Sequence, residues 1–96
     1  MYVRVVRFTG VTRERMDSLV SQVDEAGGPP EGVATTGIQV MFDESQGTAV
    51  VLQTFATAED MEAGARVFSA MDPSETPGTR ISVDMCELSL DRRVNS

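Results

Sequence analysis

The sequence predicts a single α+β domain in which four strands and two helices alternate in the order β-α-β-β-α-β. Two observations support this: four runs are rich in β-branched and aromatic residues, and two apolar stripes with helical spacing each follow a threonine. Glycines and prolines separate these segments. The length of 96 residues suits one domain, which we expect to span residues 1–91, with residues 92–96 as a polar C-terminal tail.

The first half of the chain is expected to hold a strand and then a helix. The strand is Tyr2–Phe8. Thr12 is expected to cap the helix, because its hydroxyl can accept a hydrogen bond from an amide of the first turn. Val11 stands at the position of a hydrophobic staple against the helix, and Gly27 ends the helix. The apolar stripe of this helix consists of Met16, Leu19, Val20 and Val23.

The second half is expected to contribute a hairpin, a helix and a last strand. The hairpin strands are Gly37–Phe42 and Thr48–Phe55. Thr57 is followed three residues later by an acidic residue, which is a signature of a helix start. Gly64 lies inside this helix and indicates that its backbone comes close to the sheet. The fourth strand is predicted at Arg80–Asp91.

This order of elements is typical of the ferredoxin-like split β-α-β fold. Its right-handed crossovers place both helices on one face of a four-stranded antiparallel sheet. Such a sheet should alternate apolar and polar residues, but these strands are apolar on both sides. Val50 and Leu52 point to one side of the third predicted strand, and Val51 points to the other.

The second apolar face needs cover, because large exposed apolar patches are rare on soluble monomers. The simplest cover is a second copy of the chain, so we expect a homodimer that packs sheet against sheet. The alternative is a monomer with a few valines on its surface.

The composition excludes several classes of function. The chain has 15 acidic and 8 basic residues, all of the latter arginine, and its net charge is -7. Nucleic acids and anionic membranes need a basic surface, so neither is an expected partner. No apolar run approaches the roughly 20 residues that span a bilayer. The chain has no histidine, which removes most zinc sites and every Ser-His-Asp triad, and no metal or cofactor is expected.

The single cysteine and the start of the chain bear on the compartment. Cys86 cannot form an internal disulfide, and the first residues lack the charged and apolar regions of a signal peptide. Both observations predict a cytoplasmic protein. The use of arginine without lysine is typical of a GC-rich bacterial genome. Cys86 lies in a predicted strand and is expected to behave as a small buried hydrophobic residue, since no histidine is present to activate it.

Polar side chains interrupt the apolar strands and suggest a ligand site. Small-molecule sites are mostly apolar, with a few polar groups that converge on the ligand. We therefore expect a small apolar or aromatic molecule to be bound by residues of the first three strands, namely Arg4, Val6, Phe8, Gln39, Gln53 and Phe55. The alternative is that the polar groups reach water at strand ends and edges, or that an arginine pairs with a carboxylate across the dimer.

The chain resembles the dimeric α/β-barrel superfamily, in particular its antibiotic-biosynthesis-monooxygenase-like (ABM-like) domains. The resemblance covers nearly all of residues 2–91 and rests on strand order, length and the passage VVLQTFATAEDM at Val50–Met61. In this passage a strand runs through an aromatic position into a helix with an acidic start. The resemblance implies a homodimer with a cleft between sheet and helices in each subunit, and it implies that Phe55 lines that cleft.

Two functions remain open. Catalytic members of this group commonly place a histidine in or after the second helix, and residues 63–68 contain none. The haem-degrading branch uses an asparagine, a tryptophan and a histidine, whereas this chain has only Asn95. One function is a module that binds a small apolar or aromatic molecule without catalysis. The other is a cofactor-independent monooxygenase or isomerase for a small aromatic or polyketide-like substrate, whose anion Arg4 or Gln53 would stabilise.

Overall fold

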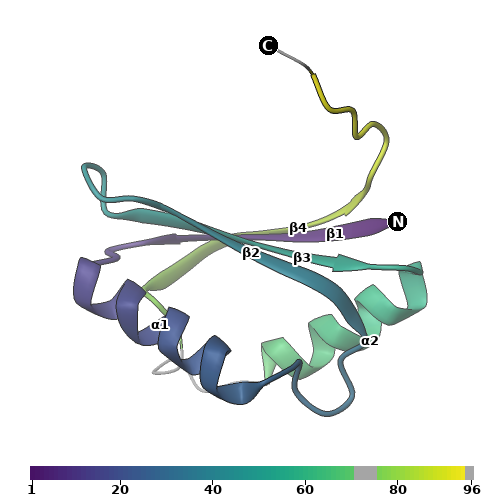
Figure 1. Ribbon diagram of the computed structural model, residues 1–96, viewed down its shortest axis with the longest axis horizontal. Helices are drawn as coiled ribbons and strands as arrows, with labels where there is room; N and C mark the ends of the chain where they lie inside the picture. The colour runs from purple at the N-terminus through teal and green to yellow at the C-terminus, as the bar shows by residue number, and fades with distance from the viewer. Residues whose placement is uncertain (71–75, 95–96) are drawn as a thin grey trace.

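The computed structural model describes residues 1–70 and 76–94 and confirms the predicted order of elements. The last two residues of the predicted tail lie outside the described residues. The strands and helices are β1 (Tyr2–Thr9), α1 (Arg13–Ala26), β2 (Thr35–Asp43), β3 (Thr48–Phe55), α2 (Ala58–Ser69) and β4 (Thr79–Glu87). The strands form one antiparallel sheet in the order β2-β3-β1-β4, and both helices lie on the same face of it (Figure 1). The architecture is therefore ferredoxin-like.

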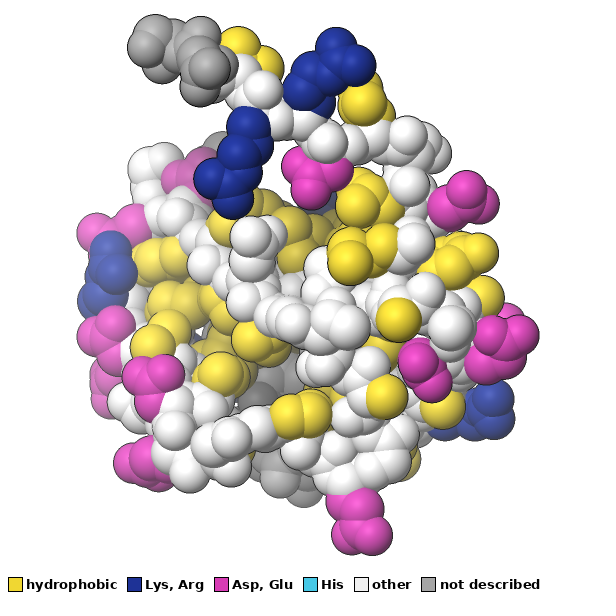
Figure 2. Space-filling model, turned by 45° about the vertical axis from the view of Figure 1, so that its right-hand side comes forward, with side chains coloured by type: hydrophobic (Ala, Val, Ile, Leu, Met, Phe, Trp, Pro, Cys, Tyr) yellow, Lys and Arg dark blue, Asp and Glu magenta, His cyan; other side chains and the backbone are white. Residues whose placement is uncertain are grey.

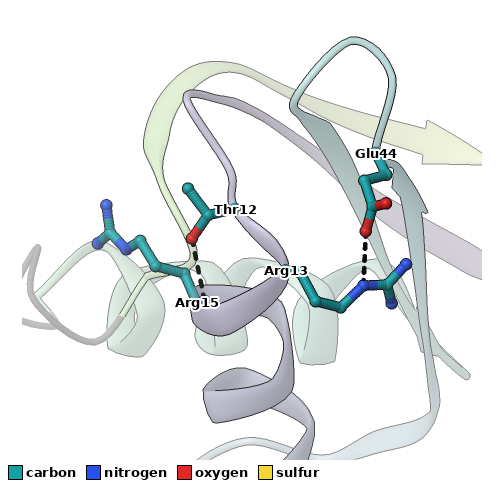
Figure 3. Close-up of polar contacts among 4 residues, drawn as sticks. All are labelled: Thr12, Arg13, Arg15 and Glu44. Atoms are coloured by element: carbon teal, nitrogen blue, oxygen red, sulfur yellow. Dashed lines mark hydrogen bonds and ion pairs between the residues drawn. The ribbon is translucent and has the colours of Figure 1, made fainter.

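Both helices begin at the threonines that the sequence indicates. The Thr12 hydroxyl accepts a hydrogen bond from the amide of Arg15 at 3.2 Å (Figure 3). The Thr57 hydroxyl accepts one from the amide of Asp60 at 3.1 Å. Helix α1 ends where Gly27 takes a φ of 68°, a left-handed conformation that glycine adopts without a steric penalty. Local sequence thus decides where each helix begins and where α1 ends.

The turn between β2 and β3 holds the start of α1 in place. The backbone amide of Val11 donates a hydrogen bond to the carbonyl of Gly47 at 2.8 Å. Arg13 Nε donates to a carboxylate oxygen of Glu44 at 2.7 Å (Figure 3). Both of these side chains are exposed, so the ion pair contributes no more than about 1 kcal/mol. The backbone bond, whose donor residue Val11 is buried, is therefore the more important of the two contacts.

The hydrophobic core lies between the sheet and the helices. One cluster surrounds the start of α1, and it shows that Val11 and Met16 pack together as the predicted staple requires. A second cluster lies under α2 and contains Val33, Phe55 and Met61. The core residues of β1 and β3 alternate with partly exposed ones, as expected for strands with one covered face.

Strand β4 is shorter than the sequence predicts. The predicted strand Arg80–Asp91 ends at Glu87, and the chain after it leaves the sheet (Figure 1). The pairing ends where Tyr2, the first residue of β1, lies opposite Glu87. One further backbone bond joins the amide of Leu88 to the carbonyl of Met1 at 2.9 Å.

Gly64 allows α2 to lie close to the sheet, as the sequence suggests. A Cβ atom at this position would lie 2.9 Å from Cε1 and 3.0 Å from Cζ of Phe55. Phe55 is completely buried, with 0% of its surface exposed, so its ring has little room to move. Glycine is therefore required at position 64, because any larger residue would come too close to the ring of Phe55.

We expect Gly64→Ala to lower the free energy of unfolding by about 1–3 kcal/mol, because overpacking outweighs the helix preference of alanine, which is about 1 kcal/mol. Urea denaturation measures this change. Gly28→Ala is the control, since a Cβ there meets nothing within 4 Å, and its effect should stay within about 0.5 kcal/mol. Unchanged stability of Gly64→Ala would show that α2 can shift away from Phe55 at no cost.

Candidate functional site

A cavity of about 460 Å³ lies between the sheet and the helices. Its wall is formed by the helix-facing sides of β1, β2 and β3, the second half of α1, the loop after α1, and the segment before β4. Most of the wall is apolar, and Figure 2 shows hydrophobic side chains within a hollow on one side of the molecule. The volume falls in the range of small-molecule sites.

The cavity exists because the two helices pack differently. Helix α2 packs closely against β1, β2 and β3, whereas α1 contacts the sheet less extensively. Met16 is the buried residue of α1. Leu19 and Val23 line the cavity, and Val20 is exposed. The predicted apolar stripe of α1 is therefore core at Met16, borders both core and cavity at Leu19, and lines the cavity at Val23.

Four of the six predicted site residues line the cavity: Arg4, Val6, Phe8 and Gln53. They lie on the two central strands, and Arg4 stands directly opposite Gln53 in the register of β1 and β3. Residues opposite each other in an antiparallel pair share one face of the sheet. Alternation along these strands then turns all four side chains toward the helices.

The structure does not place the other two predicted residues at the cavity. Gln39 is exposed and pairs with Leu52, which places it on the face of the sheet without helices. Phe55 faces the helices, but it is sealed in the core by Met61 and the close approach at Gly64. The resemblance implied a cleft-lining Phe55, and in this chain that aromatic residue is part of the core.

Arg4 is a buried arginine in the cavity wall, with 3% of its surface exposed. Its Nη1 donates a hydrogen bond to Oε1 of Gln53 at 2.9 Å. Its guanidinium carbon lies 5.2 Å from the centre of the Phe68 ring, a cation-π contact. The Nε atom is buried and has no hydrogen-bond partner. Among the described residues, no carboxylate forms an ion pair with Arg4.

These contacts compensate only part of the cost of burying the charge of Arg4. Taking an ion out of water costs several kcal/mol. A hydrogen bond to a charged group returns about 1.5–3 kcal/mol, and a cation-π contact about 0.5–2 kcal/mol. Burial lowers the pKa of Arg4, and the positive charge of Arg80 lowers it further. Arginine nonetheless keeps its proton in proteins, so the cavity wall carries a positive charge that no carboxylate of the described residues pairs with.

Two residues of the site are not evident from the sequence. Arg80 lines the cavity at the start of β4, opposite Phe8. A register shift between Arg7 and Phe8 gives it this position, and such an irregularity has no signal in the sequence. Phe68 belongs to the apolar face of α2, and only the tertiary structure shows that it faces Arg4.

Cys86 corrects one expectation. It is exposed, not buried, and it lies opposite Val3 on an edge strand. Cys86 is uncovered because it lies on the face of the sheet that has no helices.

The described residues also bear on the binding of metal ions and on membranes. Within residues 1–70 and 76–94, no group of three or more Cys, Asp or Glu side chains could hold a metal ion. No helix in the same part of the chain is long and apolar enough to cross a membrane.

No protein-family model matches this chain, and comparisons with curated proteins and with solved structures find no match. The cavity and the uncovered face of the sheet are therefore the features that bear on function.

We expect the double variant Arg4→Met, Gln53→Leu to raise the free energy of unfolding by about 1–2 kcal/mol, because apolar groups of similar size replace a poorly compensated buried charge. Thermal and urea denaturation measure the change. Gln53→Leu alone should lower stability by about 1.5–3 kcal/mol, since it removes a hydrogen bond to the charged Arg4.

Arg66→Met is the matched control, because it removes an exposed arginine of α2 outside the cavity. Its effect should stay within about 0.5 kcal/mol. A double variant that is less stable than the wild type would mean that Arg4 is fully compensated in the folded protein.

Proposed function

We propose that this chain is a homodimeric ABM-like domain that binds a small apolar or aromatic molecule in the cavity between sheet and helices, without a catalytic histidine. The cavity itself carries the proposal. Concave, mostly apolar spaces of several hundred Å³ with a few polar groups are typical of small-molecule sites. A mostly apolar space of about 460 Å³ with a buried Arg4–Gln53 pair in its wall fits a bound organic molecule.

The ABM-like part of the proposal is supported by the arrangement of the elements. The sheet order and the two helices on one face are those expected for such a domain. The passage Val50–Met61 runs from β3 through the Thr57 cap into α2. Phe55, the aromatic residue of this passage, supports α2 from the core.

A neutral apolar probe tests the binding function. We expect N-phenylnaphthylamine to bind the wild type with an increase in its fluorescence, because its environment changes from water to an apolar cavity. Val23→Phe should reduce this increase several-fold, since Val23 lines the cavity and a larger side chain takes up ligand space.

The matched control is Val20→Phe on the same helix, at a residue that is exposed and outside the cavity. It should leave the fluorescence increase unchanged. Equal binding by both variants, or no binding by the wild type, contradicts the proposed site.

The dimer is supported by the face of the sheet without helices (Figure 1). This face presents the partly exposed apolar side chains of Val3, Val5, Val50 and Leu52. The chain after β4 rises on the same side in Figure 1, and Leu90 and Val94 in it are 72% and 83% exposed. A second copy of the chain, related by a two-fold axis, would cover both the face and these side chains.

We expect the wild type at micromolar concentration to sediment with twice the 10.4 kDa mass of one chain. Leu52→Glu should sediment as a single chain, because it places a charge at the centre of the uncovered face. Ser18→Glu, on the exposed surface of α1, should keep the wild-type mass. A wild type that sediments as a single chain refutes the dimer.

The alternative function is a cofactor-independent monooxygenase or isomerase for a small aromatic or polyketide-like substrate. The observation in its favour is that Arg4 and Gln53 place polar groups inside an apolar space, where they could stabilise a substrate anion. No acidic residue of the described chain lines the cavity, so the substrate would have to ionise by itself. Consumption of dioxygen with candidate phenols by the wild type, but not by Arg4→Met, would favour this alternative over simple binding.

A further inference from the structure

We propose that the molecule bound in the cavity is a carboxylate: an apolar or aromatic compound whose negatively charged group pairs with Arg4. This inference rests on the proposed binding function, and it adds the charge and functional group of the ligand. It follows from the charges and the unused hydrogen-bonding groups of the cavity wall.

The guanidinium of Arg4 has hydrogen-bonding groups that the described part of the chain does not use. Gln53 occupies Nη1, and Nε has no partner. The edge of the guanidinium formed by Nε and Nη2 is therefore left unused by the described residues. Two parallel N–H groups on one edge are the arrangement with which arginine binds a carboxylate through both oxygens.

The rest of the cavity wall reinforces this charge. Arg80 lines the same cavity, and its positive charge acts on Arg4. None of the described lining residues is acidic, although the chain has 15 acidic residues. Two arginines that repel each other thus line one cavity in a chain with a net charge of -7. An anion in the cavity offsets this repulsion and supplies a counter-charge that the described lining residues lack.

The apolar walls define the remainder of the ligand. Val6, Phe8 and Val51 on the sheet and Leu19 and Val23 on α1 all line the cavity. These side chains offer dispersion contacts and no hydrogen bonds. The ligand therefore has one charged end, which contacts Arg4, and an apolar or aromatic body.

Binding of a naphthalene carboxylate and of the isosteric naphthalene carboxamide to the full chain tests this inference. The two compounds share an apolar body and differ in charge, so isothermal titration calorimetry at neutral pH isolates the effect of the anion. We expect the wild type to bind the carboxylate at least about tenfold more tightly than the carboxamide.

Two variants assign this preference to the arginines. Arg4→Met should abolish the preference, by weakening carboxylate binding about tenfold or more while changing carboxamide binding less than about twofold. Arg80→Met, at an exposed residue, should weaken carboxylate binding to a smaller extent. It tests the inference even if Arg4→Met fails to fold. Arg66→Met, an exposed change outside the cavity, should leave both affinities unchanged.

The outcomes separate this inference from the function on which it rests. Equal affinity of the wild type for both compounds, or a preference that survives Arg4→Met and Arg80→Met, contradicts the inference that the ligand is a carboxylate. Either result is still compatible with the proposed apolar binding site. Failure of both compounds to bind, together with failure of the neutral fluorescent probe, overturns the binding function and the inference with it.

Discussion

The antiparallel register between β1 and β3 is the constraint on which the rest of this structure depends. These are the two central strands, and their pairing sets Arg4 opposite Gln53 and Phe8 opposite Ala49. Because successive side chains point to opposite faces, a shift of one residue would exchange the core face with the uncovered face. The core, the cavity wall and the apolar outer face all follow from this one pairing.

The helices divide the covered face into a packed half and an open half. Gly64 brings the backbone of α2 against the ring of Phe55, so that half is filled. Helix α1 is fixed mainly at its start, by Met16 in the core and by the backbone bond from Val11 to Gly47. Its second half stands off the sheet and forms one wall of the cavity. The same sheet therefore provides both a stable core and space for a ligand.

Arg4 links this architecture to function, because its burial lowers stability unless something in the cavity compensates it. A purely structural role would be served better by an apolar residue of similar size. Functional sites are places where a fold retains such unfavourable features. The buried guanidinium and the empty space beside it are explained together if the partner of the charge is a ligand.

The sequence by itself determined the order of elements, both helix caps, the end of α1 and the need for a small residue at Gly64. These features depend on local backbone chemistry and on periodicity, which neighbouring residues decide. It also indicated Arg4 and Gln53, because polar residues that interrupt an apolar strand are visible in the chain, and Val6 and Phe8, which alternate with Arg4 on one side of their strand. Gln39 and Phe55 do not line the cavity, because Gln39 lies on the other face of the sheet and Phe55 lies in the core.

Only the tertiary structure decided where β4 stops, that Arg80 reaches the cavity, and that α1 lines a space instead of closing it. The end of β4 depends on where its pairing with β1 ends, and the position of Arg80 depends on a register shift in that pairing. The cavity depends on how closely each helix approaches the sheet. All three are relations between segments far apart in the chain, so no local pattern of residues contains them.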